Sequence, residues 1–299
     1  MPPPPAAPKW ETHPIEQKLA RGKFWWSRVS VNGADLWAVL DTASHDLLIP
    51  DAEACTQCAD RAANPDSSNG ARAEPKHFSI ETVHVRQGDG TVCTSEQTCA
   101  RAPVHWIVSA ERLGYAVRGV GPSEQTSAAL PFVGVGLPLA GNRGRMWYHP
   151  NPVNHARSAC VRMLLKPAIE HGHKHSLPCV RVTQCAVNGG APAPVSSDLG
   201  AAMLDTGTPG CVIPHEWAPA LAKRLGAPKG DTVACGTDVV AHIGPELQVA
   251  LKSPFFGGTA DSMHRRYGVC AIIGSESMRG FGVEFYYKEG IVRWTPLKL

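Results

Sequence analysis

Two stretches of the chain place an aspartate inside an otherwise apolar run. The first, AVLDTASHDLLIP (Ala38 to Pro50), carries Asp41, and the second, AMLDTGTPGCVIP (Ala202 to Pro214), carries Asp205. Burying a lone carboxylate among apolar residues is costly unless other groups pair with it. Two carboxyl groups that a fold brings together can share one proton and act as an acid–base pair. These two aspartates are therefore the first candidates for chemistry.

The surroundings of the two aspartates repeat. Each stretch is preceded by an Asn-Gly pair, Asn32-Gly33 in the first copy and Asn188-Gly189 in the second, and each ends in Ile-Pro. Asn-Gly is typical of a tight hairpin turn. We therefore expect each copy to contain a hairpin turn, a strand, a sharp polar turn that carries the aspartate, and a second apolar strand.

A second pair of segments extends the repeat. Phe132-Val133-Gly134 follows the first aspartate, and Ile272-Ile273-Gly274 follows the second. Two apolar residues ending in Gly suit a strand that packs closely against another backbone, where a side chain would not fit. The pattern predicts two related lobes, each with one aspartate turn and one such strand.

The composition favours a turn-rich β protein. The 299 residues are 43% hydrophobic and 18% charged, and 29 Gly with 26 Pro disfavour long helices. The net charge of +3 is mixed along the chain, and no apolar run approaches 18 residues, so nothing indicates a nucleic-acid or membrane partner. One amphipathic helix is predicted over His215 to Leu225, with Trp217, Leu221 and Leu225 on one side.

The predicted organisation has three parts. Residues 1–23 form a Pro-rich N-terminal extension, residues 24–165 an N-terminal lobe with Asp41, and residues 166–299 a C-terminal lobe with Asp205. The first residues, MPPPPAAPKWE, lack the basic and apolar segments of a signal peptide. We expect them to be a flexible or polyproline-like tail.

Ten cysteines are many for an intracellular protein of this size. Cys93 with Cys99 and Cys235 with Cys270 are candidates for disulfides, which would imply an oxidising compartment. Cys55 and Cys58 form an isolated C-x-x-C, expected to be a structural disulfide, with a redox pair as the alternative. The missing signal peptide argues against an oxidising compartment, so the location of the protein stays open.

From Phe24 to Leu299 the chain resembles the pepsin-like aspartic proteases. The motifs that carry the resemblance are, in order, DTAS at Asp41, LLIP, C-x-x-C, QGDGT at Gln87, FVGVG at Phe132, DTGT at Asp205 and the final IIGSESMRGFGVEFYYKEGIVRWTP. The resemblance implies an all-β, bilobal fold with a few short helices. It also implies a substrate cleft between the lobes and a hairpin flap over that cleft.

The function implied by this resemblance is hydrolysis of polypeptides by an aspartic endopeptidase, a monomer without cofactor or metal and most active at acidic pH. Asp41 and Asp205 would be the catalytic dyad. The ionised member would take a proton from a water that attacks the peptide carbonyl, while the protonated member hydrogen-bonds the carbonyl oxygen.

The resemblance also assigns supporting roles. Two threonines would lock the turns together, and a Ser and a Thr would hydrogen-bond the carboxylates. The supporting residues are Thr42, Ala43, Ser44, Thr206, Gly207 and Thr208. The flap residues would be Gln87, Gly88, Asp89, Gly90 and Thr91.

Three positions depart from the family pattern. Ala43 stands where the family has Gly, Gln87 where it has the flap Tyr, and Leu48 where it has the Trp that bonds this Tyr. Because the Tyr and the Trp are both absent, neither is left without its hydrogen-bond partner. These departures motivate an alternative, a catalytically silent pepsin-like protein that binds peptides or a protein partner through the cleft.

A third hypothesis is a metal-binding module. HGHKH (His171 to His175), with Cys179 and Cys185 nearby, offers imidazole and thiol groups. It lacks a carboxylate or a further His at fixed spacing, so it is not a zinc signature. The favoured interpretation is a solvated loop between the lobes.

Overall fold

The computed structural model describes residues 12–18, 23–54, 83–95, 98–110, 116–122, 132–148, 158–170, 173–227, 233–257 and 267–297 of the chain. Within them the protein is mostly β, and its strands join in one large mixed sheet. This confirms the predicted all-β class. No helix in these ranges is long and apolar enough to pass through a lipid bilayer.

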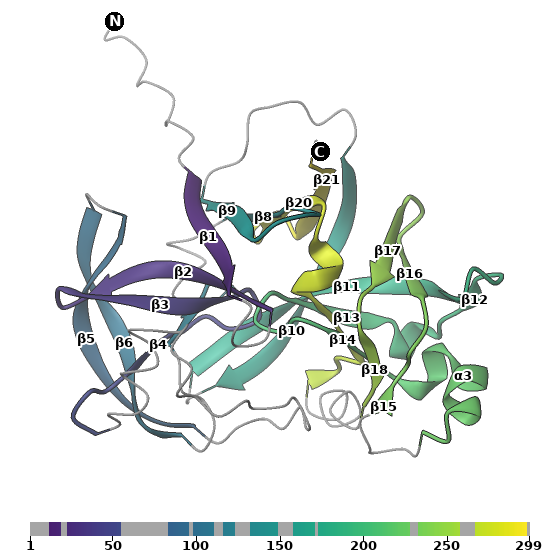
Figure 1. Ribbon diagram of the computed structural model, residues 1–299, viewed down its shortest axis with the longest axis horizontal. Helices are drawn as coiled ribbons and strands as arrows, with labels where there is room; N and C mark the ends of the chain where they lie inside the picture. Colours follow the sequence, from purple (N-terminus) through teal and green to yellow (C-terminus); the bar gives the residue numbers. More distant parts are fainter. Residues whose placement is uncertain are drawn as a thin grey trace, which may run out of the picture.

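The strands up to residue 170 are β1 (Thr12–Lys18), β2 (Phe24–Val31), β3 (Ala34–Asp41), β4 (Leu47–Pro50), β5 (Val83–Ser95), β6 (Thr98–Ala110), β7 (Ala116–Gly119), β8 (Phe132–Leu137), β9 (Arg143–Trp147) and β10 (Ala159–Glu170). The later strands are β11 (His173–Val187), β12 (Ala193–Pro194), β13 (Ala201–Asp205), β14 (Cys211–Ile213), β15 (Val233–Ala234), β16 (Val239–Ile243), β17 (Leu247–Leu251), β18 (Pro254–Phe256), β19 (Ala271–Gly274), β20 (Phe281–Tyr286) and β21 (Ile291–Pro296). The described helices are short: η2 (Ser197–Leu199), η3 (His215–Trp217), α3 (Pro219–Arg224) and η4 (Ser275–Met278). Figure 1 shows β2 to β6 gathered at one end of the molecule, and β15 to β18 with α3 at the other.

The first aspartate lies at the end of β3. The predicted hairpin turn joins β2 to β3, and both turn residues are left-handed, with φ of 52° at Asn32 and 83° at Gly33. β3 runs parallel to β7 and places Asp41 opposite Gly119. β4 then pairs antiparallel with β7 and parallel with β6.

The second aspartate lies at the end of β13 in the same pattern of pairing. The turn at Asn188-Gly189 is again left-handed, with φ of 52° and 68°. β13 is antiparallel to β11 and parallel to β19, which places Asp205 opposite Gly274. β14 then pairs antiparallel with β19 and parallel with β18. The repeat in the sequence is therefore also a repeat in strand pairing.

The segment Phe132-Val133-Gly134 does not lie beside the strand of Asp41. Phe132-Val133-Gly134 belongs to β8, which pairs with β20 and β9, and a Cβ on Gly134 would lie 2.2 Å from the Trp147 indole. The place beside β3 belongs to β7, where a Cβ on Gly119 would lie 2.6 Å from the backbone nitrogen of Asp46. No strand was predicted here, because Arg118 before Gly119 departs from the apolar-apolar-Gly pattern. Arg118 is buried and donates a hydrogen bond to the hydroxyl of Tyr148.

The helix predicted over His215 to Leu225 is broken. A 3-10 turn (η3) ends at Trp217, and α3 restarts with Pro219 as its first residue. Proline lacks the N–H that a continuous helix needs, but it suits a first helical position. Trp217 and Leu221 pack in the main core as expected, whereas Leu225 is 38% exposed.

Two expected non-strand regions contain strands. Within the extension 1–23, β1 pairs with β2 and β9, while the Pro-rich residues before it lie outside the described ranges. Within HGHKH, β11 begins at His173 and His175 is buried, so this part is not a solvated loop.

The division at residue 165 falls inside β10, which pairs with both β21 and β11.

The cysteine predictions have mixed outcomes. Cys93 and Cys99 form the predicted disulfide across the β5–β6 hairpin. Cys235 and Cys270 are both free thiols and are not bonded to each other. The Cys270 thiol donates to the carbonyl of Asp198 at 3.4 Å. Burial raises the pKa of the Cys235 thiol to about 12. Cys55 and Cys58 lie outside the described residues.

The core anchors both aspartate strands. Leu40 and Leu204, the residues that precede the two aspartates, are fully buried in the main apolar cluster with Ile213, Phe285 and Trp294. Burying a leucine side chain stabilises the fold by roughly 1.5–3 kcal/mol. Each aspartate is therefore attached to a strand end that cannot move without disturbing the core.

Candidate active site

Two threonines join the two aspartate turns. The N–H of Thr42 donates to Oγ1 of Thr206, and the N–H of Thr206 donates to Oγ1 of Thr42, each at 3.1 Å. The hydroxyl of Thr42 donates to the carbonyl of Leu204 at 2.8 Å, and that of Thr206 to the carbonyl of Leu40 at 2.7 Å. Both threonines are fully buried. Four reciprocal hydrogen bonds thus hold together two turns that are 164 residues apart.

Each carboxylate is held by its own turn. Oδ1 of Asp41 accepts the N–H of Ala43 at 2.7 Å and of Ser44 at 3.2 Å. Oδ1 of Asp205 accepts the N–H of Gly207 at 2.7 Å, and its Oδ2 accepts the hydroxyl of Thr208 at 2.5 Å. These bonds fix both side chains in one orientation.

Ser44 differs from its expected role. Its backbone N–H holds Asp41, but its hydroxyl is buried and has no hydrogen-bond partner within the described part of the chain. The Thr208 hydroxyl does bond the carboxylate in the second turn. The two turns are therefore related but not identical.

The two carboxyl groups meet at Gly207. A Cβ added to Gly207 would lie 2.7 Å from Cγ of Asp41 and 3.1 Å from Oδ1 of Asp205. Real Cβ atoms essentially never come as close as 2.7 Å, so a larger residue at this position would have to displace the Asp41 carboxyl. The close approach of the second turn to Asp41 therefore depends on the glycine in DTGT.

The dyad is asymmetric. Asp205 is buried, while Asp41 is partly exposed. The pKa of Asp205 is raised well above its usual value by burial, by the negative charge of Asp41 and by a side-chain hydrogen bond with Asp41. The hydrogen bonds from Thr208 and Gly207 act in the opposite direction and lower this pKa. The raised pKa favours the protonated form of Asp205.

The loop after Asp41 is supported from behind by β7 and the residues that follow it. The N–H of Val120 donates to the Asp41 carbonyl at 2.8 Å, and the N–H of Gly121 to the Ser44 carbonyl at 2.7 Å. The hydroxyl of Tyr287 donates to the Val120 carbonyl at 2.9 Å. Burial, with a smaller contribution from the charge of Asp41, raises the pKa of Tyr287 well above its usual value, so this phenol stays a hydrogen-bond donor.

The methyl group of Ala43 lies against the second half of the site. Ala43 is partly buried and packs on an apolar cluster that contains Met203, Val212 and Ile272, from β13, β14 and β19. Its N–H still bonds the Asp41 carboxylate. The extra methyl group relative to glycine therefore packs against apolar side chains while the turn keeps its hydrogen bonds.

The proposed flap residues lie within a strand. Gln87, Gly88, Asp89, Gly90 and Thr91 belong to β5, and Gln87 is in register with His105 of β6. Thr91 exchanges hydrogen bonds with Asn32 at the turn between β2 and β3. That turn is at the opposite end of β3 from Asp41, roughly 25 Å away along the strand.

The position of the expected Trp is apolar. Leu48 is buried with Ile107, Val117 and Val85, and it is in register with His105 of β6. Leu48 and Gln87 thus flank the same histidine from the two strands that pair with β6.

A polar cluster near the dyad was not predicted. Nε2 of His45 lies 3.0 Å from Oδ1 of Asp46, and Nδ1 of His105 lies 3.5 Å from the same oxygen. The ring of His45 stacks on His175 of β11 at 4.6 Å. The adjacent His-Asp pair after DTAS was a visible signal, but its partners are distant in sequence. Within the described ranges, no group of three or more His, Cys, Asp or Glu is arranged to hold a metal ion.

No protein-family model matches the chain, and a search of curated proteins finds no match either.

Proposed function

We propose that the protein is an aspartic endopeptidase of the pepsin-like type, with a bilobal fold and a cleft that takes an extended polypeptide. The observation that carries this proposal is the reciprocal threonine interlock, which holds the Asp41 and Asp205 turns together. The repeated strand pairing and the separation of the two ends in Figure 1 support the bilobal arrangement. A peptide-hydrolysing dyad needs no further group than these two carboxyls and a water.

The asymmetry of the pair suggests separate roles. The Asp41 carboxylate takes a proton from the attacking water, while Asp205 hydrogen-bonds the substrate carbonyl oxygen and transfers its proton to it. The water oxygen bonds to the carbonyl carbon and gives a tetrahedral diol. When the C–N bond breaks, the proton on Asp41 passes to the leaving nitrogen. Asp205 takes up the proton from the collapsing diol, so the dyad is restored with one proton.

The activity should be highest at acidic pH. When both carboxyls are protonated no base is present, and when both are ionised no acid is present, so the rate follows a bell-shaped profile. The raised pKa of Asp205 sets the alkaline limb. Activity is therefore expected to fall as the pH rises through that value.

The first prediction tests this activity. The folded protein should cleave a denatured protein substrate at acidic pH, and a statine-type transition-state analogue should block the cleavage. Asp41→Asn and Asp205→Asn keep the side-chain size but remove the carboxyl, and each should lower kcat by at least roughly 100-fold. Cleavage is measured from pH 3 to 7 by mass spectrometry of the products.

Two results would contradict the proposal. The first is no cleavage at any pH by wild-type protein whose folding has been verified by circular dichroism. The second is equal cleavage by the wild type and both Asn variants, which would indicate a contaminating protease.

A second candidate is a catalytically silent protein that binds peptides through the same cleft. It is favoured by the methyl group of Ala43 beside the dyad and by the position of Gln87 inside β5. The Ala43→Gly variant distinguishes the active endopeptidase from the catalytically silent protein. Because Ala43 keeps the hydrogen bond to Asp41, we expect wild-type activity and a change in kcat of less than about tenfold on reversion. An inactive wild type and an active Ala43→Gly variant would instead favour the silent protein.

A further inference from the structure

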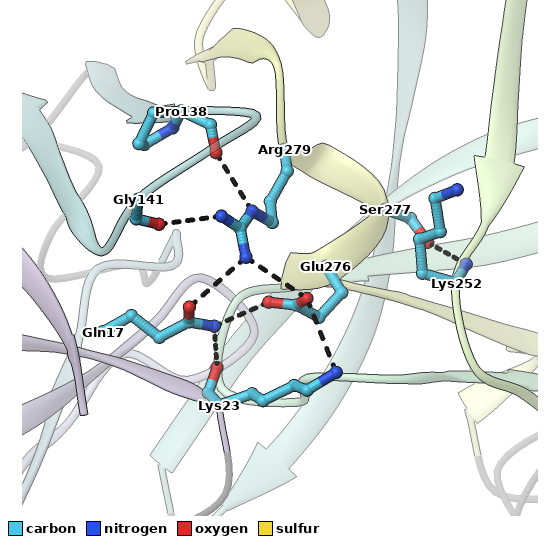
Figure 2. Close-up of polar contacts among 8 residues, drawn as sticks. All are labelled: Gln17, Lys23, Pro138, Gly141, Lys252, Glu276, Ser277 and Arg279. Carbon is cyan, nitrogen blue, oxygen red and sulfur yellow. Dashed lines mark hydrogen bonds and ion pairs between the residues drawn. The ribbon is translucent and has the colours of Figure 1, made fainter. Parts of the chain in front are cut away.

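A buried glutamine in β1 connects the N-terminal strand to η4 (Figure 2). Gln17 is only 3% exposed. Its Nε2 donates to the carbonyl of Lys23 at 3.0 Å and to Oε1 of Glu276 at 2.6 Å. Both hydrogens of its amide are therefore used, as a buried polar group requires. The bond to Glu276 joins residues 259 positions apart.

Arg279 completes this contact. Its Nη1 donates to Oε1 of Gln17 at 3.3 Å and lies 3.5 Å from Oε2 of Glu276. Its Nε and Nη2 donate to the carbonyls of Pro138 and Gly141, at 3.0 and 2.8 Å. The guanidinium thus binds β1, η4 and the loop after β8 together. Gln17, Glu276 and Arg279 are called the latch below.

The latch leads directly to the second aspartate turn. The N–H of Glu276 donates to the carbonyl of Pro209 at 3.0 Å, and the N–H of Ser275 donates to the carbonyl of Thr208 at 2.8 Å. The hydroxyl of Thr208 in turn donates to Asp205. A Cβ on Gly274 would lie 1.9 Å from the carbonyl oxygen of Gly210, so η4 begins in tight contact with this turn. A displacement of Glu276 therefore moves the backbone that holds Asp205.

We propose that the latch positions Asp205 for catalysis, so that strand β1 belongs to the catalytic apparatus. Gln17, Glu276 and Arg279 are positioning residues, since they act through Thr208 and Pro209. The catalytic part of this inference rests on the proposed function. The mechanical link between β1 and the Asp205 turn does not depend on it.

Strand β1 does not need the latch to stay in the sheet. It pairs with β2 from Ile15 to Lys18 and with β9 from Thr12 to Glu16. These backbone pairs remain when the Gln17 side chain is changed. Removal of its amide should therefore leave the fold intact and loosen mainly η4 and the Asp205 turn.

The first test uses Gln17→Leu. Amide hydrogen exchange of the peptide that covers Thr206 to Gly210 should become at least roughly tenfold faster. If the protein cleaves peptides, kcat should fall by roughly 10- to 100-fold, because small displacements of a catalytic group have effects of this size. KM should change by less than about twofold, since no substrate contact is removed.

The pH profile gives a readout that a purely structural role would not move. The Thr208 hydroxyl lowers the pKa of Asp205, so a looser turn weakens this bond and raises that pKa further. The alkaline limb of the Gln17→Leu profile should therefore shift to higher pH.

Variants of the charged residues keep the inference testable if Gln17→Leu does not fold. Glu276→Gln retains the oxygen that accepts from Gln17 and should keep most of the activity, whereas Glu276→Ala should reproduce the effects of Gln17→Leu. Lys23→Met is the matched control. Its ammonium lies 4.0 Å from Glu276 and is 57% exposed, so its loss should change neither exchange nor kcat.

Each outcome bears on the latch separately from the proteolytic activity. Unchanged exchange at Thr206 to Gly210 in folded Gln17→Leu or Glu276→Ala protein would overturn the latch. Faster exchange with unchanged kcat and pH profile in an active protein would overturn its catalytic role. A wild type that cleaves nothing would contradict the proposed function alone, and faster exchange would still support the mechanical link.

Discussion

The dyad depends on a few residues with distinct tasks. Thr42 and Thr206 bind the two turns together, and Gly207 leaves the space that lets the second turn approach Asp41. The raised pKa of Asp205 follows from its burial and from the nearby charge of Asp41. The geometry of the site thus depends more on the contacts that each turn makes with the opposite turn than on the aspartates themselves.

Gly207 gives the sharpest prediction at the scale of single residues. Gly207→Ala would put a methyl group 2.7 Å from Cγ of Asp41, so one carboxyl must move. We expect kcat to fall by roughly 100-fold and stability by roughly 1–3 kcal/mol, as for overpacked sites. Activity assays and urea unfolding measure the two effects.

The matched control is Gly282→Ala in β20, where the nearest atoms to an added Cβ lie at 3.5 Å, an ordinary contact. It should leave kcat within about twofold of the wild type. A fully active Gly207→Ala protein would show that the two carboxyls do not meet as described.

The elements around each aspartate form the same arrangement twice. β3, β4 and β7 surround Asp41 in the way that β13, β14 and β19 surround Asp205. Asn-Gly turns and apolar strands were predictable because turn type and strand character are local properties. The strand beside β3 was not predicted, because pairing is set by contacts across the sheet and Arg118 departs from the apolar-apolar-Gly pattern.

The helix after β14 also differs from its prediction, and here the cause is a nearby residue. Apolar spacing predicted one helix, but Pro219 restarts it, and Leu225 does not reach the core. Trp217 and Leu221 do pack in the core, the first from η3 and the second from α3.

At the scale of the whole molecule, burial of the dyad makes stability depend on pH. The pKa of Asp205 is higher in the folded state than in the unfolded chain, so its contribution is fully present below the unfolded value of about 3.9. That contribution is lost as the pH rises through the folded value, because Asp205 must then ionise beside Asp41.

Asp205→Asn should therefore stabilise the protein at pH 7 relative to the wild type, and should do so much less at pH 3–4. Urea midpoints or Tm values at the two pH values measure this difference. Asp51→Asn provides a control of opposite sign. A hydrogen bond from Arg86 lowers the pKa of Asp51, so its contribution is present above the unfolded value and lost as the pH falls.

A stabilising effect of Asp205→Asn that did not vary with pH would contradict the assigned ionisation of the pair. In that case the carboxyl of Asp205 would not change its protonation between the two conditions.

The sequence by itself determined the all-β class, the Asn-Gly turns, the Cys93–Cys99 disulfide and the two aspartate stretches. These follow from composition and from neighbours close in the chain. Only the tertiary structure decided that β7 lies beside β3, that His45 and His105 gather at Asp46, and that Gln17 binds Glu276. Each of these contacts joins segments distant in the chain, and whether they meet depends on how the whole sheet folds, which no local pattern encodes.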